Sequence, residues 1–500
     1  MYRTTLTLLL LLLVDHAYSQ NGTLSSREQH EYDKNDLIKE YIEFRASVNQ
    51  EYAEFMEMAW KSYGMKDPIP FPIKKWDEPI HYKKQEQKQG KEQEKGVEIK
   101  IASKPIVPLP TIGKLKNQPQ PVCTIPEIKD DEKAYGFEYY GTPMKVRWAN
   151  AASFKLAGTD KKSISDAYRK FSSSQYNNLL YDCLKIRKEL TLCDWAYYKM
   201  LQALAESACG KGTNEAVFLQ GFLYQQSGYM MRFGLDDQRN LHLLVRINGA
   251  AYRSGYTSIN GQLFFLFDGS KLKNLNVCEM AYPGEKIMQL DIEKLPKLDV
   301  DLSDNRTVIS RFVSVQADIA VNKNIINFFN DYPSTYKENN IMTNWAYYAN
   351  TPISDEVKKN VYPQLKEQIK NGTKLMGANL LLNWVQMGLD YAKDPVVWGY
   401  ERAFFAEESL FYPKCDCEDR AILYSRLIRD LLGLDVVLIY YPEHVYTAIC
   451  FNEPVDGDYI MVEGRKFVVA DPTYYSANVG RTMSRMDNGK AEIILLNKDL

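Results

Sequence analysis

Residues 413–433 read PKCDCEDRAILYSRLIRDLLG, and this stretch decides how the C-terminal part of the chain is interpreted. Pro413 disfavours a helix before it, and apolar residues recur at helical spacing from Ala421 to Leu432, up to Gly433. The pattern predicts that Cys417 lies at or beside the N-terminus of a helix. There the first-turn N–H groups and the helix macrodipole favour an anion, and the thiolate is the nucleophilic form of cysteine.

Two downstream residues can complete a set of reacting groups with this thiol. His444 lies between the strand-like runs Val436–Tyr441 and Val445–Phe451, and it is the one histidine of five that falls in the same C-terminal unit. Asp471 follows the strand-like run Lys466–Ala470 and precedes a Pro-Thr turn. A carboxylate at that strand end can hold the imidazole in the tautomer that takes the thiol proton, which is the general arrangement of nucleophile, base and orienting group.

The order Cys-Glu-Asp-x-Ala at a helix start, His at a strand start and Asp-Pro-Thr at a strand end resembles the transglutaminase-like superfamily of papain-related folds. The resemblance covers about residues 375–480. It implies an α+β domain with the nucleophile at the head of a helix and His and Asp on neighbouring strands of a small antiparallel sheet. Carried over to this chain, the implied nucleophile is Cys417, the base is His444 and the orienting group is Asp471.

The family includes transglutaminases, cysteine peptidases and amide-cleaving glycanases. The resemblance therefore implies a thiol hydrolase that acts on an amide or peptide bond of a protein or peptide substrate through a cysteine acyl-enzyme. Two alternatives remain open. One is a protein cross-linking acyltransferase that forms the same acyl-enzyme, and the other is a non-catalytic binding or scaffold protein that reuses the fold.

The stretch departs from the family pattern just before the nucleophile. Lys414, Cys415 and Asp416 stand where a small Gly is usual, and Cys415 is a second candidate thiol. Cys417 is favoured because the acidic pair follows it directly, and a disulfide between cysteines two residues apart would be strained. The predicted oxyanion donors are the backbone N–H of Cys417 and the side chain of Gln386, for which the alternative is an exposed amide on a helix.

A sharp structural condition follows from the spacing between the base and the orienting group. A further strand-like run, Tyr459–Val462, lies between His444 and Asp471 in the sequence. A simple three-strand meander would put the two residues at opposite ends of the sheet. The triad therefore requires that the strand of His444 pair directly with the strand of Asp471, with Tyr459–Val462 on the far side.

The rest of the chain divides by pattern. Residues 1–19 are predicted to be a signal peptide, because Arg3 precedes the apolar run Leu6–Val14 and a small-x-small site ends at Ser19. The mature protein is therefore expected to be exported, as a periplasmic or secreted protein. Residues 20–130 are predicted to hold an amphipathic helix over Asn35–Tyr63, then a solvated charged tract over His81–Gly96 and a Pro-rich extended segment.

The remaining units complete an α+β organisation. Residues 131–234 are predicted to be a helical unit, with helices between Ser163 and Gly228, and residues 235–322 a β-rich unit in which Asn248-Gly249 and Asn260-Gly261 mark hairpins. Residues 323–500 are predicted to form the transglutaminase-like domain, with helices over Ser354–Asn371 and Leu375–Tyr391 ahead of the cysteine stretch.

Composition narrows the choice of partners. Lys and Arg number 62 and Asp and Glu number 64, so charge alone gives no attraction to nucleic acid or to a membrane surface. No run after the signal peptide approaches the ~18 apolar residues of a membrane span, so no integral span is expected after signal cleavage. The irregular cysteine spacing, the few histidines and the lack of a calcium-loop pattern predict no metal and no other cofactor.

Overall fold

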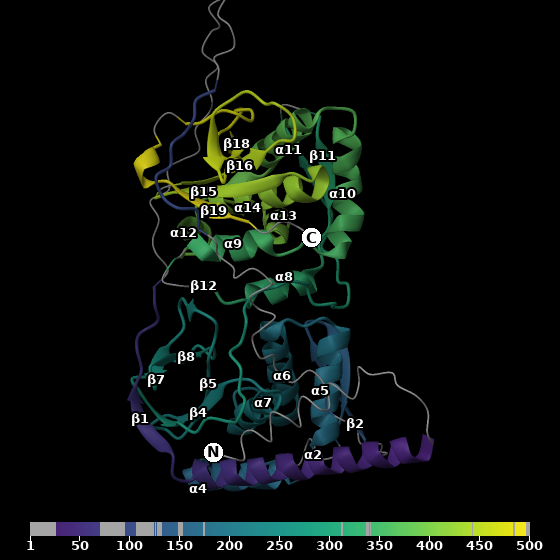
Figure 1. Ribbon diagram of the computed structural model, residues 1–500, viewed down its shortest axis with the longest axis vertical. Helices are drawn as coiled ribbons and strands as arrows, with labels where there is room; N and C mark the ends of the chain where they lie inside the picture. Colours follow the sequence, from purple (N-terminus) through teal and green to yellow (C-terminus); the bar gives the residue numbers. More distant parts are fainter. Residues whose placement is uncertain are drawn as a thin grey trace, which may run out of the picture.

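The computed structural model shows an α+β protein. It describes residues 27–70, 96–106, 125, 127, 133–148, 154–173, 176–311, 314–336, 340, 342–442, 444–483 and 486–496, with side chains of the first helix described from Ile38. Within these residues the chain forms twelve α-helices, a near-closed six-stranded antiparallel barrel and a curled five-stranded antiparallel sheet. The barrel and its helices lie at one end of the molecule, and the five-stranded sheet lies at the other (Figure 1).

The barrel corresponds to the predicted β-rich region and extends beyond it. Its strands, in spatial order, are β1 (Trp60–Gly64), β9 (Asn274–Cys278), β4 (Met231–Leu235), β5 (Leu241–Val245), β8 (Gln262–Leu266) and β7 (Tyr256–Ile259). The backbone N–H of Lys66 donates to the carbonyl of Tyr256 at 2.7 Å, which nearly closes the barrel between its first and last strands. The predicted Asn260-Gly261 turn joins β7 to β8, with φ angles of 50° and 77° that fit a tight hairpin turn.

The prediction of one helix over Asn35–Tyr63 is wrong at its C-terminal end. Helix α2 covers Arg27–Met56, and β1 follows it. β1 pairs along its whole length with β9, from Trp60 opposite Cys278 to Gly64 opposite Asn274. The aromatic spacing of this segment also fits a helix, but periodicity within the segment contains no information about a partner strand so distant in sequence.

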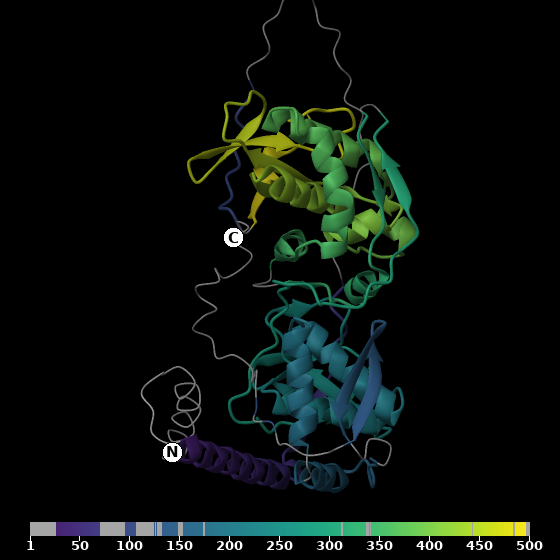
Figure 2. The ribbon, with the colours of Figure 1, turned by 90° about the vertical axis from the view of Figure 1, so that its right-hand side faces the viewer.

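Four helices pack beside the barrel, where the sequence predicted a helical unit. They are α4 (Lys161–Ser172), α5 (Asn177–Glu189), α6 (Asp194–Cys209) and α7 (Asn214–Gln226). Asp160 caps α4 by accepting the N–H of Ser163 at 3.0 Å, and Thr213 caps α7 by accepting that of Ala216 at 3.2 Å. α2 runs across the end of the molecule farthest from the C-terminal sheet (Figure 2), and a hairpin of β2 (Ala134–Tyr139) and β3 (Thr142–Arg147) packs on these helices.

The connecting region carries short elements. These are β6 (Ala250–Ala251), which pairs with β12 (Thr335–Tyr336); the hairpin of β10 (Arg306–Ile309) and β11 (Gln316–Ile319); and helices α8 (Lys323–Asn330) and α9 (Met342–Asn350). α8 and β12 lie between the two halves of the molecule in Figure 1.

The C-terminal half places helices around the five-stranded sheet. The predicted helices are α10 (Asp355–Ile369), α11 (Lys374–Gly388) and α14 (Cys417–Leu427), which continues as a π-helix (Ile428–Leu432) up to Gly433, whose φ is 64°. Shorter elements are β13 (Asp390–Tyr391), α12 (Asp394–Val397), α13 (Ala406–Phe411), β14 (Lys414–Cys415) and the 3-10 helix Asn488–Lys490. The sheet order is β17 (Tyr459–Val462), β18 (Arg465–Ala470), β16 (His444–Cys450), β15 (Asp435–Tyr441) and β19 (Glu492–Leu495).

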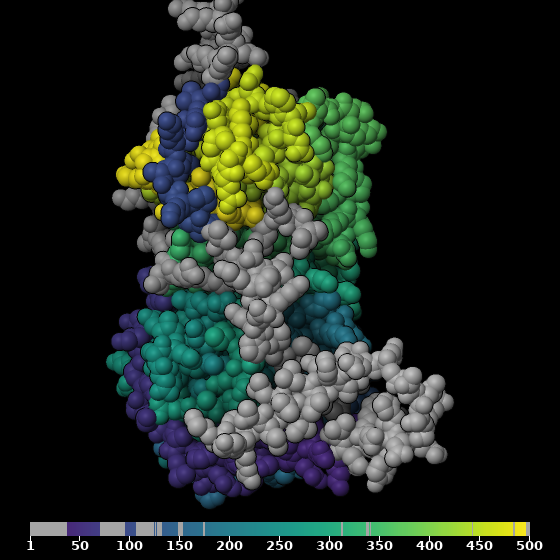
Figure 3. All heavy atoms as spheres, in the orientation of Figure 1, coloured from purple at the N-terminus to yellow at the C-terminus, as the bar shows by residue number. Residues whose placement is uncertain are grey.

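An extended segment from the N-terminal part of the chain lies on this sheet. The N–H of Ile99 donates to the carbonyl of Tyr459 at 2.7 Å, and that of Ile106 donates to the carbonyl of Ile493 at 2.8 Å, so residues 96–106 contact both sheet edges. Ile99 is buried in an apolar cluster with Phe467 and other residues of the sheet. Figure 3 shows this segment in blue against the yellow C-terminal residues. The extended conformation predicted after Val97 is therefore observed where the segment is described.

Several predictions fall on residues that are not described. They are the signal peptide over residues 1–19, most of the charged tract His81–Gly96, and most of the Pro-rich segment that follows residue 106. Within the part of the chain that the structure describes, no helix is both long enough and apolar enough to cross a membrane.

Candidate functional site

Cys417 is the first residue of α14, as the sequence predicted. The residue before it, Asp416, is extended, with a φ of −108°. Asp419 fixes this helix start, because its Oδ2 accepts the N–H of Asp416 at 3.1 Å and its Oδ1 accepts the N–H of Phe404 at 2.8 Å. The Cys417 side chain is only 1% exposed, and its thiol donates to Oε2 of Glu418 at 3.2 Å. The candidate nucleophile therefore lies at a well-fixed and buried helix N-terminus.

The strand order that the triad requires is confirmed. β16 pairs directly and antiparallel with β18, with Thr447 opposite Ala470, and β17 lies on the far side of β18. This pairing brings His444, at the start of β16, to Asp471, just after the end of β18. Nε2 of His444 and Oδ2 of Asp471 are 2.8 Å apart, and both side chains are buried. Because Asp471 occupies Nε2, Nδ1 is the ring nitrogen that can take a proton from a thiol.

The Asp471 carboxylate is held by its own turn. Its Oδ1 accepts the backbone N–H of Thr473 at 2.8 Å and that of Tyr474 at 3.2 Å. These bonds orient the carboxylate, so its second oxygen faces the imidazole without competition from the turn. A carboxylate placed in this way can stabilise the imidazolium that forms when the ring takes a proton.

Helix α14 packs directly against β16, so the helix that begins with Cys417 covers the strand that begins with His444. The second candidate thiol, Cys415, precedes the helix and lies in the short strand β14. Burial raises the pKa of Cys415 to about 11, against the opposing charge of Arg420. A thiol with such a pKa is almost wholly protonated at neutral pH, which makes Cys415 a poor nucleophile.

Gln386 has a different role from the predicted one of oxyanion donor. It is buried in α11, and its Nε2 donates to the carbonyls of Asp471 at 2.9 Å, Tyr474 at 2.8 Å and Ala477 at 3.1 Å. An amide group has two hydrogens, and these three carbonyls engage both. Gln386 therefore supports the turn that carries Asp471, and neither the oxyanion role nor the exposed-amide alternative fits its position.

Arg420 is a supporting residue that the sequence patterns did not single out. It is fully buried, and its guanidinium donates to the carbonyls of Gln386 at 3.2 Å, Leu389 at 2.7 Å and Pro472 at 3.5 Å. These bonds tie α14 to the end of α11 and to the Asp471 turn. The available signal was the i, i+3 spacing from Cys417, which places Arg420 on the same helix face as the thiol.

None of the cysteines among the described residues forms a disulfide. They are Cys183, Cys193, Cys209, Cys278, Cys415, Cys417 and Cys450. Cys193 and Cys209 are partly exposed, and the other five are buried. These different environments supply internal references for any measurement of the reactivity of Cys417.

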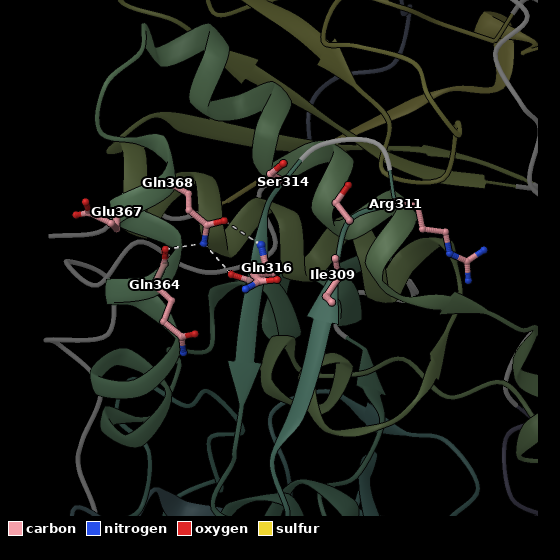
Figure 4. Close-up of a pocket in the computed structure, with 8 residues that line it drawn as sticks. Ile309, Arg311, Ser314, Gln316, Gln364, Glu367 and Gln368 are labelled. Atoms are coloured by element: carbon pink, nitrogen blue, oxygen red, sulfur yellow. Dashed lines mark hydrogen bonds between the residues drawn. The ribbon is translucent and has the colours of Figure 1, made fainter.

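A hollow of about 650 Å³ lies on another face of the same half of the molecule, between α10 and the β10–β11 hairpin (Figure 4). Gln368 of α10 points toward Gln316 of β11, donating to its carbonyl at 2.7 Å and accepting its N–H at 2.9 Å. Gln364 makes the same pair of bonds to Asp318, both at 3.0 Å. The two glutamines thus cover a strand edge, and the hollow contains none of the predicted site residues.

Comparisons with protein-family models, with curated proteins and with solved structures found no match for this chain.

Proposed function

We propose that the C-terminal half of this chain is a thiol hydrolase of transglutaminase-like type, which cleaves an amide or peptide bond through an acyl-enzyme on Cys417. The observation that carries the proposal is the hydrogen bond between His444 and Asp471, formed across the strand pairing that a triad requires. The position of Cys417 at the head of the helix that packs on the His444 strand supports it. We also propose that the protein is exported, because residues 1–19 have the pattern of a signal peptide.

In the proposed reaction, Nδ1 of His444 takes the thiol proton as the sulfur of Cys417 attacks the substrate carbonyl carbon. The oxyanion is stabilised by the backbone N–H of Cys417, which belongs to the first turn of α14, where N–H groups have no acceptor within the helix. The imidazolium then gives its proton to the leaving amine, and a thioester remains on the sulfur. A water molecule, deprotonated by His444, attacks the thioester and releases the acid and the free thiol.

The second candidate function is a non-catalytic binding or scaffold protein that keeps the same fold, and the burial of Cys417 favours it. A thiol that is 1% exposed must be uncovered before a substrate carbonyl can approach its sulfur. The enzyme proposal therefore requires a local opening near the start of α14. Cross-linking of the acyl group to an amine instead of water would use the same residues.

Alkylation by iodoacetamide at pH 6, followed by mass spectrometry of the cysteine peptides, tests the proposal without a known substrate. Cys209 is the internal reference, because it is partly exposed and burial raises its pKa to about 11. If His444 activates Cys417, Cys417 is alkylated at least about tenfold faster than Cys209 despite its burial, and the advantage disappears in His444→Ala.

The matched control is His242→Ala, which removes another buried histidine, paired with Asp268 at 2.7 Å in the barrel. This change should leave the alkylation rate of Cys417 as it is in the wild type. Slower alkylation of Cys417 than of Cys209, with no effect of His444→Ala, would favour the non-catalytic candidate.

A further inference from the structure

Two buried tyrosines lie next to the imidazole of the proposed base on the five-stranded sheet. Tyr446 is two residues after His444 in β16, so their side chains extend from the same face of the strand. The two rings are stacked, with centroids 5.7 Å apart and planes inclined by 29°. Tyr441 of β15 lies directly opposite His444 in the antiparallel pairing. Both tyrosines are buried, so this part of the site is closed to water.

A directed chain of hydrogen bonds holds the Tyr446 ring. The hydroxyl of Tyr441 donates to Oδ1 of Asn488 at 2.8 Å, so its single hydrogen is engaged there. The hydroxyl of Tyr446, 3.1 Å from that of Tyr441, is therefore the donor of the bond between them. The two phenol rings also stack, with centroids 5.6 Å apart and planes inclined by 14°. The ring that stacks on His444 is thus fixed through its hydroxyl, by way of Tyr441 and Asn488.

The Tyr446 phenol stays neutral in this environment. Burial, reinforced by the neighbouring Tyr441, raises the pKa of the Tyr446 hydroxyl well above its ordinary value, and the charge of Asp471 acts in the same direction. A neutral phenol keeps its hydrogen for Tyr441 and takes none from the imidazole. What Tyr446 presents to His444 is therefore the face of its ring, which carries the negative part of the aromatic quadrupole.

We propose that Tyr446 is a positioning residue for His444, whose ring holds the plane of the imidazole and stabilises the imidazolium that forms when it takes the proton of Cys417. A cation within ~6 Å of an aromatic centroid is attracted to the negative face of the ring, and the centroid separation of 5.7 Å lies within this range. Because the attraction acts fully only on the charged imidazole, it favours proton transfer from the thiol. The inference rests on the proposed function, in which His444 is the base.

Stacking also limits the orientation of the imidazole. The χ2 torsion of histidine has broad minima, so the side chain alone fixes the ring plane only weakly. The hydrogen bond between Nε2 of His444 and Asp471, at 2.8 Å, holds one edge of the ring, and rotation about that bond remains free. The Tyr446 ring opposes this rotation from the imidazole face. The carboxylate thus selects the tautomer, and the tyrosine selects the plane in which Nδ1 is offered to the thiol.

Alkylation of Cys417 at pH 6, measured against Cys209 in the full chain, tests the proposal with three variants. Tyr446→Leu removes the aromatic ring and should lower the alkylation rate of Cys417 at least about two- to fivefold. Tyr446→Phe keeps the ring and loses only the hydroxyl, so its rate should stay within about twofold of the wild type. Phe467→Leu is the matched control, because it removes a buried ring from the same apolar cluster on β18. It should leave the rate at the wild-type value.

The tautomer of His444 provides a readout that a merely structural role would not move. It is observed by ¹⁵N NMR of the full chain labelled at its five histidines, and the spectrum of His444→Ala assigns the signal. The wild type and Tyr446→Phe should show one tautomer, with the hydrogen on Nε2. Tyr446→Leu should show signals averaged between ring orientations. A single tautomer together with the wild-type alkylation rate in Tyr446→Leu would overturn the proposal.

A fluorinated ring keeps the test decisive if Tyr446→Leu does not fold. Pentafluorophenylalanine incorporated at position 446 has nearly the size of phenylalanine, but the face of its ring is not negative. Cys417 should then be alkylated about two- to fivefold more slowly than in Tyr446→Phe. Equal rates in these two chains would overturn the stabilisation of the imidazolium by the ring.

The proposed function and the positioning role fail in different measurements. If Cys417 of the wild type is alkylated no faster than Cys209, the proposed function fails, and the NMR signal of His444 still decides whether Tyr446 holds the imidazole. If the advantage of Cys417 is present in the wild type and unchanged in Tyr446→Leu and in the fluorinated chain, only the positioning role fails.

Discussion

Replacing Asp471 by Asn should separate the stability of the site from its reactivity. The Asn side chain has nearly the same shape, and its amide oxygen can still accept the N–H groups of Thr473 and Tyr474. Its NH2 then faces Nε2 of His444, where the carboxylate oxygen lies at 2.8 Å in the wild type. Because the amide donates, Nε2 must accept, and the ring hydrogen moves to Nδ1. An imidazole in that tautomer cannot take the proton of Cys417.

The expected energies differ clearly between Asn and Ala at this position. Asp471→Asn replaces a charge-assisted hydrogen bond by a neutral one, which costs about 1–2 kcal/mol. Asp471→Ala removes the partner of His444 and the side-chain acceptor of the buried N–H of Thr473, at about 1–3 kcal/mol for each of these two lost interactions. The Ala variant should therefore be destabilised by about 2–6 kcal/mol, more than the Asn variant.

Guanidinium denaturation and alkylation of Cys417 measure the two effects on the same samples. We expect Asp471→Asn to unfold at a midpoint modestly below that of the wild type, yet to lose the alkylation advantage of Cys417 as completely as His444→Ala does. Asp471→Ala should lose both stability and the alkylation advantage of Cys417. The reasoning is refuted if Asp471→Asn keeps the wild-type alkylation rate, or if the Ala variant is no less stable than the Asn variant.

Two further predictions concern residues that support the C-terminal half. Among the described residues, Gln386 is the only side-chain donor shared by the carbonyls of Asp471, Tyr474 and Ala477, and Gln386→Leu removes it. Chemical denaturation should then show a free energy of unfolding lower by roughly 2–4 kcal/mol. An unchanged midpoint would contradict this role. Burial raises the pKa of Glu407 to about 7, above its value in the unfolded chain. The folded state therefore holds the proton more tightly, and the stability that this group contributes at low pH is lost as the pH rises from about 4 to about 7. Tm measured across this pH range should fall less in Glu407→Gln than in the wild type, and parallel curves would show that Glu407 does not titrate in this way.

The sequence predicted the C-terminal elements well because their patterns are local. The apolar spacing after Cys417 and the terminal Gly433 define α14 within a single segment, and the alternating runs around His444 define β15 and β16 in the same way. From the sequence, the strand order could be given only as a condition for the triad. A three-strand meander and the observed pairing both fit the same alternation of residues along the strands. The structure resolved that choice in favour of the β16–β18 pairing.

Features that depend on distant parts of the chain could not be found from local patterns. β1 is a strand only because β9 lies beside it, although its aromatic spacing fits a helix. The buried carboxyl groups of Asp394 and Glu401 meet those of Asp416 and Glu418 only through folding, so no motif within one segment marks them. Gln386 is another example, because the three carbonyls that bind its amide lie far along the chain.

The central claim, that Cys417 is an acylated nucleophile, is tested most directly by trapping the acyl-enzyme. The full chain is mixed with a small activated ester, quenched with acid after milliseconds to seconds, and mapped by mass spectrometry. We predict a burst of about one acyl group per chain on Cys417, followed by steady turnover, with the burst absent in Cys417→Ala and in His444→Ala. Acyl groups that accumulate slowly on lysines, with no burst on Cys417, would contradict the claim.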